Sequence, residues 1–223
     1  MPTLHTGHRY QSCCGKVICS GCRHAPVFDD RGNKVDNKKC PFCRTPTPKS
    51  EKAMESLKKR VEANDPEAMY NLGVCYRDGL YGYPQDHTRA LKLWHRAAEL
   101  DHTPIYLNIG YAYEYGEGVE VDKEKATYYY ELAAIGGCER ARYNLGNNEW
   151  RAGNMKRAVK HFMIAARSGH ADSLEVIKEL YSNGHATKDE YTKALRSYQT
   201  YLSEIKSPQR DKAAAADDQY RYY

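Results

Sequence analysis

Apolar and small residues recur in one order about four times along this 223-residue chain. The clearest copy lies at residues 104–137, and its leading position, Ile105, has the equivalents Ala68, Ala141 and Ser173. Successive copies therefore begin 37, 36 and 32 residues apart. A repeat of this length is typical of a helical solenoid, in which each unit packs mainly against its neighbours. We predict a stack of helical hairpins over residues 65–205.

The spacing within one copy predicts two helices joined by a turn. Ala68, Leu72 and Tyr76 lie four residues apart and so share one face of a first helix. Gly79 follows at a point where helices commonly end in a left-handed residue. A second helix places its apolar residues at i, i+1, i+4, i+7 and i+8, namely Ala90, Leu91, Trp94, Ala97 and Ala98.

Three copies carry a glycine inside the first helix, at Gly73, Gly110 and Gly146. A glycine in a helix interior costs roughly 1 kcal/mol relative to alanine, so its recurrence at one position indicates a packing requirement. We predict that the paired helix approaches closely at each glycine, near Ala90, Ala126 and Ala158.

These residues resemble the Sel-one-like repeat, a relative of the tetratricopeptide repeat. The resemblance implies an all-α fold, an α-α superhelix built as a right-handed solenoid of helical-hairpin repeats, and a protein-binding scaffold as the function. The chain departs from the family pattern at Asp101, which stands in place of a closing glycine. The last copy departs at Ser173 and Lys178, which suits a terminal cap that faces water.

Composition narrows the classes of function. The 34 basic and 29 acidic residues are spread along the chain, and the net charge is only +5. Without a basic stripe we do not expect nucleic-acid binding. No stretch approaches the ~20 apolar residues of a membrane span, and the polar first residues carry no apolar signal core. We expect no membrane association and a cytoplasmic or nuclear location, where thiols stay reduced.

Six of the eight cysteines fall within residues 13–43 and predict a zinc site. Two C-x2-C pairs lie 17 residues apart, and such a tight turn presents both sulfurs to one tetrahedral ion. A segment so poor in apolar residues needs a metal to fold. The candidate ligands are Cys13, Cys14, Cys19, Cys22, Cys40 and Cys43. The other two cysteines, Cys75 and Cys138, lie in the repeats and are expected to be small buried residues.

The cysteine segment resembles the second part of a RING finger. Residues 13–22 resemble its central ligands, and Cys40-Pro-Phe-Cys-Arg44 resembles its closing motif. The resemblance implies one complete zinc site from Cys13, Cys14, Cys40 and Cys43. It assigns Cys19 and Cys22 to a second site, whose first pair is absent from this sequence. His5 with His8, or His24, could substitute there; alternatively, Met1 is an internal start.

RING fingers commonly act as ubiquitin ligases, which hold a ubiquitin-conjugating enzyme and use no covalent catalytic residue. By this resemblance Val17, Ile18 and Pro41 would shape the docking groove for that enzyme. Arg44 would supply the cation that clamps ubiquitin, or it would be a surface charge. The competing hypothesis is a non-catalytic adaptor whose zinc finger is structural.

The repeats carry candidate residues for binding a client protein. Tyr70 and Tyr143 occupy one equivalent position, and tyrosine is common at binding hot spots. Asn71, Asn108 and Asn144 follow at the next position. Their amides could hold an extended peptide, or they could bond neighbouring repeats, which we favour because buried polar groups need partners.

Four segments follow from these patterns. Residues 1–49 form the incomplete RING-like finger, 50–64 a connecting helix with Ser50 as its N-cap, 65–205 the solenoid, and 206–223 a disordered tail. Five scattered histidines have no ligand spacing and are expected at the surface: His87, His95, His102, His161 and His170.

Overall fold

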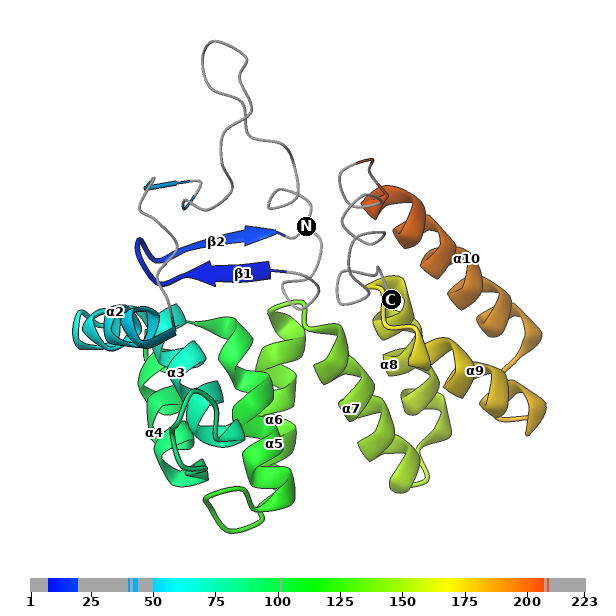
Figure 1. Ribbon diagram of the computed structural model, residues 1–223. Coiled ribbons are helices and arrows are strands. Elements are labelled where there is room, and N and C mark those ends of the chain that lie inside the picture. Colours follow the sequence, from blue (N-terminus) through cyan, green and yellow to red (C-terminus); the bar gives the residue numbers. More distant parts are fainter. Residues whose placement is uncertain are drawn as a thin grey trace.

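The computed structural model describes residues 8–19, 40, 42–43, 50–100, 102–206 and 208. Its helices follow one another along an arc, with a small β-hairpin over the end that comes first in the sequence (Figure 1). The helices are α2 (Ser50–Glu62), α3 (Pro66–Asp78), α4 (His87–Ala98), η1 (Thr103–Ile105), α5 (Tyr106–Tyr115), α6 (Lys123–Ile135), α7 (Glu139–Arg151), α8 (Met155–Arg167), α9 (Asp172–Ser182) and α10 (Lys188–Ile205). None of these described helices is long and apolar enough to cross a membrane.

The predicted helical hairpins are confirmed. Helices α3 and α4, α5 and α6, and α7 and α8 pack in pairs, and each pair contacts the next along the chain. Helices α9 and α10 pack on each other and on α8, so the last copy closes the stack. The predicted connecting helix is present as α2, which covers α3 at the opposite end of the stack.

Capping residues set where the helices begin and end. The carboxylates of Asp65, Asp86 and Asp122 accept hydrogen bonds from the free backbone N–H groups of α3, α4 and α6. Gly79 and Gly116 end α3 and α5 with positive φ of 64° and 76°. The aspartates and glycines of the repeat pattern are therefore the residues that define each hairpin.

The recurring helix glycines face aromatic rings of the paired helix. A Cβ at Gly73 would lie 2.2 Å from Nε1 of Trp94, and one at Gly110 would lie 2.5 Å from the ring of Tyr130. The third glycine has the same relation to Phe162, at 2.6 Å. The predicted close approach is confirmed, although rings one turn beyond the expected alanines make most of the contact.

Strands β1 (His8–Gln11) and β2 (Lys16–Cys19) pair antiparallel around a turn at residues 12–15. Gly15 adopts a positive φ of 72° there, and its backbone also lies against Arg60 of α2, where a Cβ would clash. The prediction of an all-α fold is therefore correct for the repeats and omits this two-stranded sheet.

A polar cluster joins the hairpin to the first repeat. The Tyr10 hydroxyl donates to Oδ2 of Asp65 at 2.7 Å, and Nε of Arg60 donates to the Ser12 carbonyl at 2.9 Å. Arg60 also pairs with Oδ2 of Asp65 at 3.4 Å. Burial, and then the bond to Asp65, raises the pKa of Tyr10, which keeps its hydroxyl a donor. We call Tyr10, Ser12, Arg60 and Asp65 the joint.

Three smaller predictions need correction. Ser173 is fully buried rather than facing water, and its hydroxyl lies 3.1 Å from Nδ1 of His170. Ser50 is the first residue of α2 rather than the residue before it. The five repeat histidines are half-buried rather than exposed, because they line the contacts between helices. Of the predicted tail at residues 206–223, everything after residue 208 lies outside the described residues.

Candidate functional site

Four cysteine sulfurs converge at the turn of the β-hairpin. Cys13 and Cys14 occupy that turn, and Cys40 and Cys43 come from the second C-x2-C pair. All four Sγ atoms lie within 4.8 Å of one another. The distance is 3.7 Å between Cys14 and Cys40 and 3.5 Å between Cys43 and Cys13, far longer than the S–S bond of about 2.05 Å in a disulfide.

The donor set fits a zinc ion. Four thiolates about 2.3 Å from a tetrahedral ion lie roughly 3.8 Å apart, which is close to the separations seen. Burial, followed by bonds to Cys43 and Cys40, raises the pKa of the Cys13 thiol. Burial also raises the pKa of Cys14. These thiols therefore need a cation to become thiolates together, and a divalent ion supplies that charge.

The structure brings together the four cysteines assigned to one site by the RING resemblance. The backbone of Cys19 ends β2, whereas Cys22, His5 and His24 lie outside the described residues. Of the predicted docking residues, Val17 is 37% exposed and Ile18 is buried. Pro41 and Arg44 lie outside the described residues.

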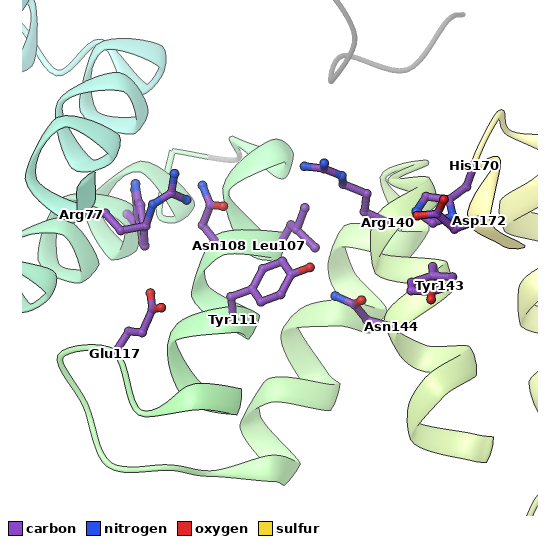
Figure 2. Close-up of a pocket in the computed structure, with 11 residues that line it drawn as sticks. Arg77, Leu107, Asn108, Tyr111, Glu117, Arg140, Tyr143, Asn144, His170 and Asp172 are labelled. Carbon is purple, nitrogen blue, oxygen red and sulfur yellow. The ribbon is translucent and has the colours of Figure 1, made fainter. Parts of the chain in front are cut away.

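A second site is an open groove of about 450 Å³ along the stack, formed mainly by the first helices of successive hairpins (Figure 2). Polar and aromatic side chains dominate its lining. The lining residues are Arg77, Trp94, Leu107, Asn108, Tyr111, Glu117, Arg140, Tyr143, Asn144, His170 and Asp172.

Two equivalent asparagines offer hydrogen-bond donors in this groove. Asn108 on α5 and Asn144 on α7 are 8% and 9% exposed. Among the described residues, Nδ2 of Asn144 has no hydrogen-bond partner, whereas Nδ2 of Asn108 makes no bond of good geometry but lies close enough to the Tyr70 hydroxyl to lower its pKa. A buried polar group without a partner costs about 1–3 kcal/mol, so such groups are normally satisfied. The favoured prediction, that these amides bond neighbouring repeats, does not hold for the Nδ2 donor of Asn144, whereas Asn108 does act on Tyr70 of the preceding repeat. The arrangement suits a ligand that supplies acceptors.

The third asparagine behaves differently. Nδ2 of Asn71 donates to the Glu67 carbonyl at 2.7 Å and to the Glu67 side chain at 3.1 Å. It is therefore used within α3, and it does not line the groove. Neither predicted role of this amide holds, because the acidic residue four positions earlier captures it.

Of the two predicted tyrosine anchors, Tyr143 lines the groove and Tyr70 does not. Tyr143 stacks on His170 with 4.5 Å between ring centroids. Burial raises the pKa of Tyr70, while the nearby Asn108 side chain opposes that rise. The Tyr70 carbonyl also accepts a bond from Nε1 of Trp94 at 3.3 Å, which ties the α3–α4 hairpin together.

Sequence reasoning missed several groove residues, above all Arg140 and Tyr111. A signal was present for Arg140, because it lies one position before the leading apolar residue and four before Asn144. Residues four apart share a helix face, so a cation there faces the same ligand as the amide.

A family model described as the Sel1 repeat matches residues 66–102, 106–138 and 140–170. These matches coincide with the hairpins α3–α4, α5–α6 and α7–α8. Helices α9 and α10 lie outside the matched residues, in keeping with the divergent last copy.

Curated relatives share the repeats. The ERAD-associated E3 ubiquitin-protein ligase component HRD3B of Arabidopsis thaliana is 33% identical over 106 residues, which cover 47% of this chain and 16% of that protein. Chitin synthase regulatory factor 4 of Schizosaccharomyces pombe is 27% identical over 124 residues, covering 55% of this chain and 20% of that protein. The matched region therefore spans a fifth or less of these relatives.

Solved structures show the same fold. A Sel1 repeat protein from Oxalobacter formigenes superposes with a TM-score of 0.60 at 26% identity, covering 72% of this chain and 66% of that one. The protective antigen c5321 of uropathogenic Escherichia coli superposes with a TM-score of 0.57 at 29% identity, covering 73% and 35%.

Proposed function

We propose that this chain, whose residues 66–170 carry Sel1 repeats, is a scaffold that binds an extended segment of a client protein in the groove. The observation that carries the proposal is the pair of buried amide donors on Asn108 and Asn144: among the described residues the Asn144 donor has no partner, and the Asn108 donor meets only the Tyr70 hydroxyl. An extended peptide has backbone carbonyls free along its length, and these are the acceptors that the amides lack.

The surrounding groove supports a peptide rather than a small molecule. It is open along the stack, and Tyr111 and Tyr143 contribute the rigid aromatic surface common at protein-binding hot spots. Repeat folds commonly provide such extended concave surfaces for partners.

The test is selection of nonapeptides from a phage-displayed library, followed by affinity measurements on synthetic copies. We expect the double variant Asn108→Ala with Asn144→Ala to bind selected peptides at least about tenfold more weakly, since two hydrogen bonds are lost. Asn154→Ala is the control, because its amide bonds Glu149 at 2.8 Å and does not line the groove. Failure to select any peptide, or equal binding by the double variant, would contradict the proposal.

A second role is supported by the cysteine cluster. Zinc held by Cys13, Cys14, Cys40 and Cys43 would complete one half of a RING-like finger, and the exposed Val17 beside it would be available to a ubiquitin-conjugating enzyme. HRD3B, a relative of the repeats, is named as a component of a ubiquitin ligase. The chain would then act by proximity, holding enzyme and client together without a nucleophile of its own.

Ubiquitin discharge from a panel of loaded conjugating enzymes tests this second role. We expect at most weak stimulation, because the first pair of the second zinc site is absent from this sequence, and we expect Val17→Arg and Arg44→Ala to remove it while the zinc content is unchanged. An inert protein across the whole panel would favour the non-catalytic adaptor, with the finger as a zinc-stabilised end of the solenoid.

A further inference from the structure

We infer that the groove recognises a carboxylate on the client segment and that Arg140 is the residue that binds it. The inference rests on the proposed function, since it specifies the chemistry of the segment that the groove holds.

Arg140 is placed to act together with the buried amides. It lies in the first turn of α7, four residues before Asn144 and on the same helix face. Its side chain is exposed and lines the groove, and it makes no ion pair or hydrogen bond with any residue that the structure describes. Its positive charge also reaches Tyr70 of α3, where it slightly opposes the larger effect of burial on the pKa.

The other charged side chains that line the groove either have a charged partner or point away from Arg140. Nε and Nη2 of Arg77 bond both carboxylate oxygens of Asp78, at 2.6 and 2.8 Å. Glu117 lies 3.5 Å from Nδ1 of His87. Asp172 sits beside His170, and the guanidinium of Arg140 extends away from it toward the α5 side (Figure 2). Among the described lining residues, Arg140 is thus the cation that lacks a counter-charge.

The guanidinium of Arg140 and the amides of Asn108 and Asn144 together define the chemistry of the ligand. A guanidinium binds a carboxylate through two parallel N–H···O bonds, which neither an amide nor a neutral side chain of the ligand can replace. Asn108 and Asn144 would bind backbone carbonyls nearby, which fixes the segment in an extended form. The carboxylate can belong to an Asp or Glu side chain or to the C-terminus of the client.

Two phage libraries distinguish these sources and test the inference. One displays random nonapeptides at the N-terminus of the coat protein, so that no C-terminus is free; the other displays them with a free C-terminus. If the carboxylate belongs to a side chain, we expect Asp and Glu to be enriched in the first library. If it belongs to the C-terminus, we expect selected peptides only in the second library, with their last residues at a constant distance from the free end. Arg140→Gln should abolish the preference and weaken selected synthetic peptides about tenfold, with a loss that shrinks at high salt.

Arg142→Gln is the matched control, because it removes the same charge from the same helix outside the groove. Thermal melts confirm that both variants fold. Selected peptides that need the asparagines yet show no preference for a carboxylate, or that bind Arg140→Gln and wild type equally, would overturn this inference and leave the proposed function standing. If no peptide is selected, the proposed function fails and the inference with it.

Discussion

Three glycines, Gly73, Gly110 and Gly146, each make room for a large ring that would otherwise prop the two helices of a hairpin apart. The rings of Trp94, Tyr130 and Phe162 are nearly or fully buried, so they have little freedom to move aside. The cost of a glycine within a helix is therefore offset by the packing of one aromatic side chain in each repeat.

Gly110→Ala is expected to destabilise the solenoid, because the new Cβ would lie 2.5 Å from the Tyr130 ring and 3.3 Å from the Ala126 carbonyl oxygen. Overpacking of this kind costs about 1–3 kcal/mol, reduced by up to about 1 kcal/mol of helix propensity. Denaturant unfolding of Gly110→Ala, of Tyr130→Leu and of the double variant should show that the two changes are strongly coupled. Simply additive effects would mean that the ring and the glycine are not in contact.

Residues that obey the repeat pattern could be placed from sequence, whereas residues used for polar contacts could not. The period locates Asn108 and Asn144 at equivalent positions, yet it cannot tell that Asn71 bonds Glu67 instead. That difference depends on which residue precedes each asparagine by four. The burial of Ser173 could likewise not be predicted, because it depends on the contact between its hydroxyl and His170 in the folded chain.

At the scale of the helices, half-buried histidines lie at packing contacts. Burial lowers the pKa of His95, His102, His161 and His170. For His161 on α8, the nearby Arg142 lowers the pKa further. The folded state therefore favours the neutral form of these histidines.

The solenoid should lose stability as the pH falls below about 6.5, the ordinary pKa of histidine. Below that pH the histidines are protonated in the unfolded chain but not in the folded chain. Their contribution to the free energy of unfolding is therefore complete above about pH 6.5 and is lost as the pH falls toward the lowered pKa values. Thermal melts between pH 7.5 and 5.5 should show this decline, and His161→Gln should make it shallower. Burial raises the pKa of Glu67, which acts in the opposite direction but equally in both proteins. A variant with an unchanged pH profile would contradict this account.

Polar contacts also connect the second and third hairpins. The buried carboxylate of Glu114 on α5 accepts a hydrogen bond from Tyr130 on α6 and pairs with Arg151 of α7 at 3.2 Å. The Tyr130 pKa is raised by burial and then by this bond, so the hydroxyl remains protonated. Adjacent hairpins are thereby held by one satisfied buried charge in addition to apolar contacts.

At the scale of the whole molecule, the finger and the solenoid have separate sources of stability. The repeats bury their own apolar cores, whereas the turn of the hairpin carries the cysteine cluster. This division was accessible from sequence, because cysteines and repeat residues occupy different segments. The joint between them was not, since Tyr10 and Asp65 lie 55 residues apart and follow no common pattern.

Metal analysis should find zinc in the purified protein and lose it in the variant with Cys40→Ser and Cys43→Ser. We expect the helical signal in circular dichroism to persist in that variant, because α3 to α10 do not need the finger for their cores. An ordered hairpin in a metal-free protein, detected by NMR, would rule out the zinc assignment. A collapse of helicity in the variant would instead show that the finger is part of the solenoid fold.

Asp65 belongs to both parts of the molecule. Its Oδ1 accepts the backbone N–H groups of Glu67 and Ala68 at 3.1 Å and so begins α3, while its Oδ2 receives the hydroxyl of Tyr10. One carboxylate therefore links the β-hairpin to the start of the first repeat. Repeats farther along the chain can therefore diverge without changing how the hairpin is attached to the first repeat. The lining of the groove and the attachment of the hairpin are thus determined by different residues of one chain.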